Sequence, residues 1–116
     1  MNTPRIESYR FGLITIDGQR YRKDLIILPS GVLPGWWRAR GHTLAPDDLS
    51  AVMEAAPELL VVGCGAYGRM QVTQETLELL DRSGIRARVM KTSEACDAYN
   101  AERQNLRTAA ALHLTC

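Results

Sequence analysis

The sequence has no long apolar run. No stretch approaches the ~20 consecutive apolar residues that a membrane-spanning helix needs. The first residues, 1–5, also lack the apolar core of a secretory signal peptide. We therefore expect a cytoplasmic protein with no membrane span.

Cysteine is scarce, with 3 among 116 residues. Cys64, Cys96 and Cys116 are odd in number and widely spaced, which argues against a disulfide framework and against a zinc site of the C-x-x-C type. The carboxylates form no convincing acid–base pair, since Asp47 and Asp48 are adjacent and suit the start of a helix. We therefore expect no metal, no cofactor and no catalytic residue.

A strong excess of charge is also absent. The net charge of +1 excludes strong non-specific attraction to nucleic acid or to anionic lipid. The charge is nevertheless uneven, because residues 1–40 carry seven Arg or Lys against three acids, while residues 41–60 carry four acids and no Arg or Lys. Any preference for an anion must therefore come from a local cluster, and we expect no nucleic-acid partner.

What is present is the composition of an ordinary globular protein, 46% apolar and 23% charged. The length is near the most frequent size of a domain. We expect residues 1–116 to form one domain.

The front of the chain has the pattern of antiparallel strands. Residues 6–16 are rich in β-formers and meet Asp17-Gly18, a typical signal of a type I′ hairpin turn. Residues 19–23 return with alternating polarity, and an apolar run follows. We predict an N-terminal hairpin or meander. Segment 32–44 has too many glycine and proline breaks for a regular element.

After residue 45, predicted helices alternate with predicted strands. Proline and threonine at first helical positions and caps favour helices that begin at Pro46, Thr73 and Thr92. The predicted strands are 59–62, 85–90 and 109–115. Right-handed crossovers would make these strands parallel. The prediction is an α/β fold: a single compact three-layer domain with a mixed central sheet, a parallel β-α-β-α-β C-terminal part and the N-terminal antiparallel hairpin.

The glycine spacing Gly63-x-Gly65-x-x-Gly68 is the only motif with cofactor associations, and it follows the strand 59–62 directly. After a strand, such a motif can bring backbone N–H groups to a diphosphate at a helix N-terminus. Here the first plausible helix begins only at Thr73. The acidic residue expected about 20 positions on, for the ribose hydroxyls, is missing. We therefore predict no dinucleotide binding.

A weak anion site at the same glycines is a separate hypothesis. Ligands of open parallel sheets sit beyond the carboxyl ends of the strands. Glycines, two cations and a helix start should meet at that edge, and the candidate anion-binding residues are Gly63, Gly65, Gly68, Arg69, Lys91 and Thr92. The alternative is that the glycines serve only a tight exit from the strand and that the threonine is an ordinary cap.

Paired tryptophans beside arginine and histidine form a second unusual cluster. Tryptophan and arginine supply most of the strong contacts at protein interfaces. They can also stack on a ligand, or plug one end of a core under arginine stems. We predict that the cluster is an interaction surface for another protein, and its residues are Trp36, Trp37, Arg38 and His42.

Cys64 and His113 are candidates for thiol chemistry with a simpler interpretation. A thiol near a helix terminus can become reactive, and a Cys–His pair would need His42 or His113 within hydrogen-bond reach. A buried, inert cysteine explains Cys64 as well. His113 alternates with leucines on an apparently buried strand, which predicts a packed, hydrogen-bonded histidine.

Ordered motifs over nearly the whole chain resemble the Mth-type domain family. The matching segments are Ser8-Tyr9-x-Phe11-Gly12, Asp24-Leu25-Ile26-Ile27, Trp36-Trp37-Arg38-x-x-Gly41-His42, Gly63-x-Gly65-Ala66-x-Gly68, Thr92-x-x-Ala95 with Tyr99-Asn100, and His113-Leu114-Thr115-Cys116.

The resemblance implies a compact three-layer α/β domain with a mixed sheet. It implies no reaction, cofactor or catalytic residue, and its best-defined role is non-enzymatic help in building a membrane-bound respiratory complex, in mitochondrial members. We predict a non-enzymatic interaction module, an assembly or accessory factor whose partner is another protein. The alternative is a small-molecule or anion-binding protein, or a weak enzyme, that uses the loop 63–68.

Overall fold

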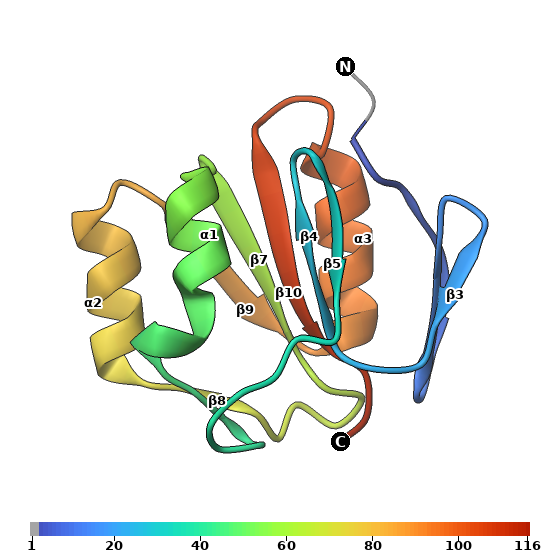
Figure 1. The fold of residues 1–116 in the computed structure, drawn as a ribbon, viewed down its shortest axis with the longest axis horizontal. Coiled ribbons are helices and arrows are strands. Elements are labelled where there is room, and N and C mark those ends of the chain that lie inside the picture. Colours follow the sequence, from blue (N-terminus) through green and yellow to red (C-terminus); the bar gives the residue numbers. More distant parts are fainter. Residues whose placement is uncertain (1–2) are drawn as a thin grey trace.

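A computed structural model of the protein describes residues 3–116 (Figure 1). The strands are β1 (Ile6–Arg10), β2 (Leu13–Ile16), β3 (Gln19–Tyr21), β4 (Leu25–Leu28), β5 (Gly31–Pro34), β6 (Thr43–Leu44), β7 (Leu59–Cys64), β8 (Gln71–Val72), β9 (Arg86–Met90) and β10 (Thr108–His113). The helices are the 3-10 turn η1 (Pro46–Leu49), α1 (Ser50–Ala55), α2 (Gln74–Arg82) and α3 (Thr92–Glu102).

A five-stranded mixed sheet forms the centre of the fold, in the order β5-β4-β10-β7-β9. Strand β10 pairs parallel with β7 and antiparallel with β4, and β7 pairs parallel with β9. The predicted parallel arrangement of the three C-terminal strands is therefore confirmed. The last strand of the chain lies in the middle of the sheet.

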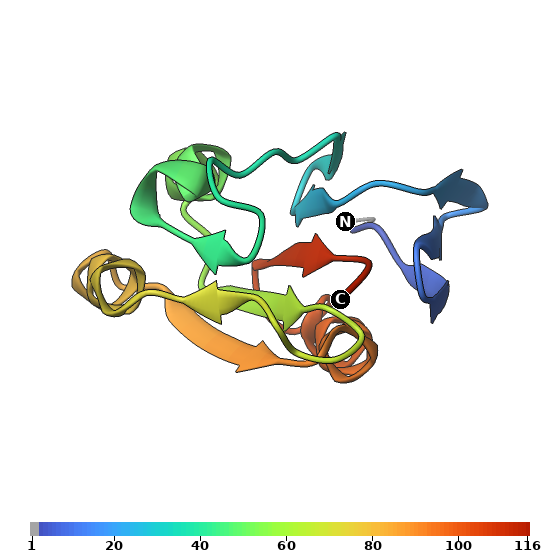
Figure 2. The same ribbon diagram turned by 90° about the horizontal axis from the view of Figure 1, so that it is seen from below.

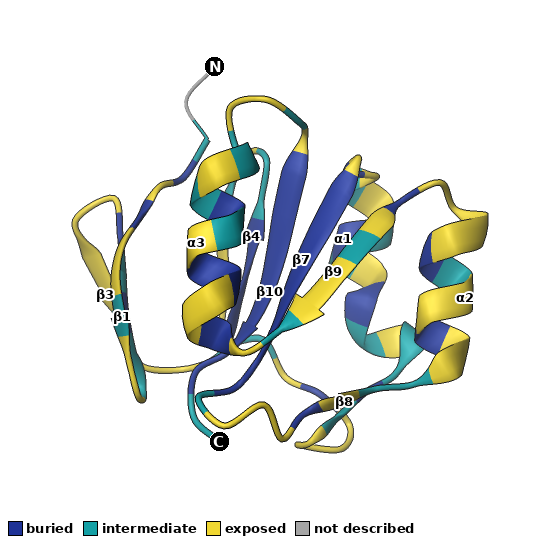
Figure 3. Cartoon of the chain, turned by 180° about the vertical axis from the view of Figure 1, so that it is seen from behind, coloured by how far each residue is buried: buried dark blue, intermediate teal, exposed yellow. Residues whose placement is uncertain are grey.

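Two apolar cores lie on opposite faces of this sheet, because alternate residues of β7 and β10 belong to different cores. Figure 2 shows α3 on one side of the sheet and α1 and α2 toward the other. Helix α3 covers one face and also packs on the N-terminal strands, whereas α1 and α2 contribute to the other core. Every residue of β7 and β10 is buried (Figure 3). A strand covered on both faces needs a continuous apolar run rather than an alternating one, and the sequences of β7 and β10 have that pattern.

The N-terminal strands form a separate three-stranded meander, β1-β2-β3, which confirms the predicted hairpin. Its turn places Asp17 at φ 49° and Gly18 at φ 80°, the left-handed pair that a type I′ turn requires. Two residues of α3 tie the segment to the domain. The Tyr99 hydroxyl donates to the Pro4 carbonyl at 2.6 Å, and the Asn100 amide donates to the Ile6 carbonyl at 2.7 Å.

Segment 32–44 is more regular than its sequence predicts. Strand β5 pairs with β4 at one edge of the central sheet. An edge strand tolerates a proline such as Pro34, because one of its sides has no neighbouring strand that needs an N–H donor. The short β6 pairs parallel with β8. The prediction of an irregular segment holds for residues 35–42 and was wrong at both ends, because an edge strand tolerates the glycine and proline that break an interior one.

The three predicted helix starts are confirmed, but the prediction that Thr92 is a cap was wrong. Thr73 caps α2 by accepting a hydrogen bond from the amide of Thr76 at 3.2 Å. The segment from Pro46 is helical but divides into η1 and α1, and Ala56 ends it in the left-handed conformation at φ 47°. Thr92 is not a cap, since the N-cap of α3 is Lys91.

Candidate functional site

Polar side chains gather where the parallel strands end. Residues Cys64 of β7 and His113 of β10 are register partners at this edge. Strand β4 runs antiparallel to β10 and pairs its first residue, Leu25, with Leu112, so Asp24 comes opposite His113. The fold therefore aligns Asp24, His113 and Cys64 across three neighbouring strands.

Asp24, Arg38 and His113 form a hydrogen-bonded cluster, called here the Asp–Arg–His cluster. Asp24 Oδ2 accepts a hydrogen bond from Arg38 Nη2 at 2.9 Å and lies 2.8 Å from His113 Nδ1. The other carboxylate oxygen, Oδ1, accepts from the amide of Leu114 at 2.8 Å. The side chains of Arg38 and His113 are only 4% and 7% exposed.

The hydrogen bonds of Arg38 determine which nitrogen of His113 carries a proton. Arg38 Nη2 has two hydrogens, and they are directed to Asp24 Oδ2 and to the Gly41 carbonyl at 2.7 Å. Arg38 Nε also donates to Gly41, at 3.0 Å. No hydrogen remains for the 3.2 Å approach of Nη2 to His113 Nδ1. His113 Nδ1 therefore carries the hydrogen that is donated to Asp24.

The surroundings keep Asp24 ionised. Burial alone would raise its pKa, but hydrogen bonds from His113, Leu114 and Arg38 favour the carboxylate and together lower the pKa below its usual value. The negative charge of Asp24 then balances the positive charge of Arg38.

Two nitrogens of the Asp–Arg–His cluster remain without a partner. Among the described residues, Arg38 Nη1 and His113 Nε2 are the buried side-chain polar atoms that make no hydrogen bond. Trp36 covers the Arg38 guanidinium with its ring centroid 4.6 Å from Cζ, and the His42 ring meets His113 edge-on at 5.6 Å. Buried polar atoms are nearly always paired, so these two nitrogens mark a place for a ligand or water.

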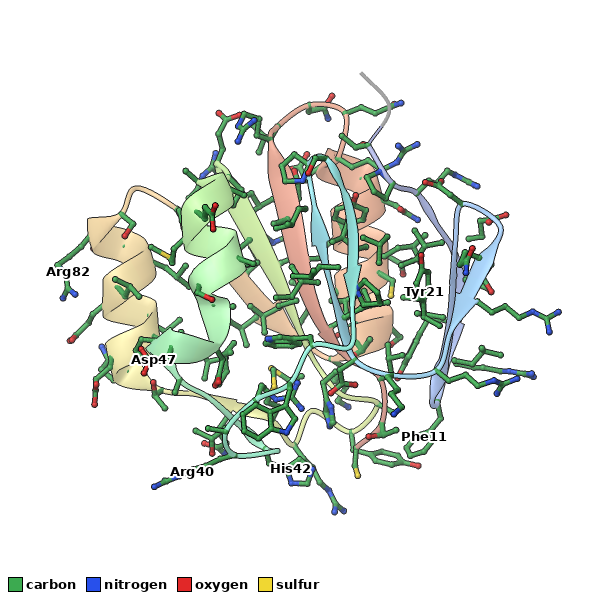
Figure 4. All side chains as sticks on the ribbon, viewed as in Figure 1. Phe11, Tyr21, Arg40, His42, Asp47 and Arg82 are labelled. Atoms are coloured by element: carbon green, nitrogen blue, oxygen red, sulfur yellow. The ribbon has the colours of Figure 1, made fainter. Side chains whose placement is uncertain are left out.

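The four residues of the predicted interaction surface divide between the interior and the surface. Trp37 is 79% exposed, and His42 is exposed at the lower edge of the molecule in Figure 4. Trp36 is half-buried and donates from its indole N–H to the Asp48 carbonyl at 2.9 Å. Arg38 is 7% exposed and faces inward, so it does not belong to an exposed surface.

Further exposed aromatic residues lie at the same edge. Phe11 and Tyr67 are 55% and 64% exposed, with their ring centroids 6.1 Å apart. The guanidinium of Arg69 lies 5.9 Å from the Tyr67 ring. We call Phe11, Trp37, Tyr67 and Arg69 the aromatic edge, because the segments that carry them all bond to main-chain groups at the end of the sheet, at Asp24, Leu114 and Cys116. Figure 4 shows Phe11 on the same lower side as His42.

The glycine loop 63–68 uses its amides within the chain. The amide of Gly65 donates to Thr92 Oγ1 at 2.8 Å, and those of Ala66 and Arg69 donate to the carbonyls of Thr115 and Cys116 at 2.6 and 3.1 Å. The amide of Gly68 donates to Gly65. An anion at this loop would therefore depend on side chains, and the anion site stays a prediction.

Glycine is required at this loop by close packing. A Cβ on Gly65 would lie 2.5 Å from the carbonyl carbon of Cys116, and its φ of 102° is strained for any other residue. A Cβ on Gly63 would lie 2.9 Å from Thr92 Oγ1. Both glycines let residues 113–116 and α3 approach β7.

Thr92 has a different role from the predicted cap. It is fully buried, and its hydroxyl donates to the His113 carbonyl at 2.6 Å while it accepts from Gly65. Its hydroxyl therefore links β7, β10 and α3. Of the predicted anion-binding residues, the cationic Arg69 and Lys91 are exposed.

Cys64 is not paired with a base. It is 5% exposed, and burial raises the pKa of its thiol, with the positive charge of Arg38 opposing this shift. Its register partner His113 has an unpartnered Nε2, so Cys64 does not donate to it. The interpretation of Cys64 as a buried thiol is supported by this environment.

Sequence reasoning missed Asp24 as a site residue. The predicted hydrogen bonding of His113 is confirmed, but the sequence did not identify its partner. The available signal was the acid directly before the apolar run of β4. A carboxylate at the start of a buried strand needs a partner, because a buried charge without one is costly.

Comparisons with known proteins agree with this architecture. The family model described as "Protein of unknown function (DUF498/DUF598)" matches residues 6–113. The crystal structure of the conserved hypothetical protein PH1505 from Pyrococcus horikoshii has a TM-score of 0.83 and 28% identity, covering 97% of this chain and 99% of that one. The protein MT938 has a TM-score of 0.79 and 28% identity, covering 98% and 100%.

A third solved structure extends the likeness of fold. A Bordetella pertussis protein described as a Mth938-like domain has a TM-score of 0.70 and 21% identity, covering 96% of this chain and 85% of that one. The resemblance to the Mth-type domain family is thereby confirmed. Within residues 3–116, no helix has the length and apolar character to cross a membrane.

Proposed function

The chain belongs to the DUF498/DUF598 family of proteins of unknown function, and on that premise we propose that it is a non-enzymatic interaction module that binds another protein. The role would be that of an accessory or assembly factor. The observation that carries the proposal is the aromatic edge, in which Trp37 is 79% exposed.

Large exposed aromatic side chains support a protein partner rather than a solvent-facing role. Tryptophan, tyrosine and arginine are the residues that contribute most to binding energy at interfaces. Phe11 and Arg69 each lie beside the Tyr67 ring, so these three side chains of the aromatic edge are already gathered. The segment with Trp37 is held from both sides, since the amide of Trp36 donates to the Asp24 carbonyl at 2.9 Å and Arg38 is anchored in the Asp–Arg–His cluster. A fixed backbone lowers the entropy lost on binding.

Site-specific photocrosslinking tests this proposal. A crosslinking amino acid placed at position 37 should capture a defined partner in cells, and one placed at Leu77, exposed on α2, should not. The purified partner should then bind Trp37→Ala and Tyr67→Ala at least about thirtyfold more weakly than the unmodified protein, because interface anchors contribute about 2 kcal/mol or more. Leu77→Ala is the matched control. Equal affinities for all variants would refute the proposal.

A second candidate is anion binding at the loop 63–68, favoured by two exposed cations beside it. Lys91 packs its stem near Gly68, with Cγ 3.4 Å from the place of a Cβ there, and Arg69 follows the loop directly. Titration with phosphate, followed by NMR, should shift the amides of residues 63–69 and leave those of residues 17–18 unmoved. An exposed site of this kind should weaken as salt is added. Shifts spread over all basic residues would contradict it.

A further inference from the structure

The Asp–Arg–His cluster has more hydrogen-bonding capacity than the chain uses. Arg38 Nη1 carries two N–H groups, and His113 Nε2 can accept or donate one hydrogen bond. Both atoms are buried without a partner. Leaving such groups unpaired destabilises a fold, most of all when the group is charged. A well-folded domain retains such a cost where a bound molecule removes it.

We propose that the Asp–Arg–His cluster is a binding site for a small carboxylate, held between Arg38 Nη1 and His113 Nε2. Arg38 Nη2 and His113 Nδ1 lie 3.2 Å apart, so the guanidinium and the imidazole that carry the two unpartnered nitrogens are direct neighbours. One carboxylate oxygen accepts from Nη1, and the second oxygen faces Nε2. This site is distinct from the loop 63–68 and does not depend on an interaction with another protein.

The charges of the site favour an anion that arrives with a proton. Asp24 and Arg38 cancel each other, and a carboxylate brings one further negative charge. Uptake of a proton at His113 Nε2 restores neutrality and turns this nitrogen into a second donor. The groups that face His113 are Asp24 before β4, Arg38 and His42 from segment 35–42, and the thiol of Cys64 on β7. The main chain of Cys116 also approaches the His113 ring, since a Cβ on Gly65 would lie 2.6 Å from the Cys116 oxygen and 2.8 Å from His113 Cδ2.

The geometry limits the ligand to a small one. The Nε and Nη2 side of Arg38 is occupied by the Gly41 carbonyl and Asp24, so a two-pronged grip on the carboxylate is not available. Trp36 lies over the guanidinium face and His42 over the imidazole. His42 is exposed and its ring is next to that of His113, so a movement of its side chain would open a route from solvent. Formate and acetate have the required size and charge.

NMR of the imidazole nitrogens tests the proposal directly, because the chain has only 2 histidines. Formate is added at constant pH and constant ionic strength, with chloride as the replaced anion, and a His42→Gln variant assigns the two rings. We expect a saturable shift of His113 Nε2 toward the protonated form and a smaller change at His42. Calorimetry in buffers of different ionisation heat should show proton uptake on binding.

Three variants decide whether the site is the one proposed. Arg38→Lys should raise the apparent Kd about tenfold or more, because it loses a charge-assisted hydrogen bond. His113→Gln should lose the proton uptake. Arg69→Ala with Lys91→Ala, which removes the exposed cations of the glycine loop, should bind formate as the unmodified protein does.

Three results would overturn the proposal. One is the absence of any shift at tens of millimolar formate and acetate, which would mean that water fills the site. Another is an equal shift with chloride. The last is loss of binding in the Arg69 and Lys91 variant, which would place the anion at the loop. If Arg38→Lys does not fold, the response of His113 in the unmodified protein still decides the question.

Discussion

The hydroxyl of Thr92 donates to the carbonyl of His113 at 2.6 Å, so the first turn of α3 holds the end of the central strand. The same oxygen accepts from the amide of Gly65 at 2.8 Å. One buried hydroxyl therefore joins α3, the loop after β7 and the end of β10, which carries His113 of the Asp–Arg–His cluster.

Replacing Thr92 by valine should destabilise the fold without changing the shape of the side chain. The change leaves the amide of Gly65 and the carbonyl of His113 without a partner, which should lower the free energy of unfolding by about 1–3 kcal/mol. Urea unfolding followed by circular dichroism measures the loss. The neighbouring exposed Ser93→Ala should change stability by less than about 0.5 kcal/mol. Equal stability of the two variants would show that the hydroxyl is not needed.

Arg38→Ala should lower the stability of the fold and not only weaken binding at the surface. Removing the buried guanidinium leaves Asp24 as an uncompensated charge, and breaking such a pair costs about 3–5 kcal/mol. Thermal unfolding of this variant should be compared with that of Arg40→Ala, since Arg40 is exposed two residues away. Equal melting temperatures for Arg38→Ala and Arg40→Ala would contradict the assignment of Arg38 to the core.

Acid should remove the contribution of Asp24 to stability. Its pKa in the folded protein lies below the usual value, whereas in the unfolded chain it is about 3.9. The stabilisation is therefore present in full above about pH 4 and is lost as the pH falls through the lower folded-state pKa. The gap in unfolding free energy between the unmodified protein and Asp24→Asn should shrink over that range. Asp47→Asn, an exposed acid on η1, should show no such convergence.

The three thiols should differ in their reactivity toward an alkylating reagent. Burial raises the pKa of the Cys64 thiol, and burial raises the pKa of Cys96 to about 12, so neither supplies much thiolate near neutral pH. Cys116 is less buried. Mass spectrometry of peptides after brief iodoacetamide treatment should find Cys116 modified first, and Cys116→Ser should react only at the rate of unfolding. Rapid labelling of Cys64 in the native protein would contradict this expectation and make Cys64 a candidate nucleophile.

The sequence was sufficient to predict the layers and the parallel strands, because those depend on local patterns. The turn at Asp17-Gly18, the cap at Thr73 and the apolar runs of β7 and β10 each fix one element by themselves. Strand β5 escaped prediction because its glycine and proline are acceptable only at a sheet edge, and the position of a strand within a sheet is not a local property.

The candidate site was harder to predict for the same reason. His113 showed that a buried histidine needed a partner, but that partner, Asp24, is 89 positions away in the sequence. Arg38 looked like part of an exposed tryptophan–arginine surface, whereas its neighbours turn alternately inward and outward. Pairing across strands decides which of these side chains meet, and no spacing along the chain reports it.

The central place of β10 has a consequence for biosynthesis. The ribosome synthesises β10 after β4 and β7. Strand β10 must then insert between these two strands and pair with both. Until residues 108–113 emerge, the nascent chain holds two unpaired strand edges and lacks the residues that β10 contributes to both cores. The long-range pairing that completes the sheet is intrinsically slow. Folding of the domain is therefore expected to wait until β10 has left the ribosome, and a chain truncated before β10 should be a target for chaperones and proteases.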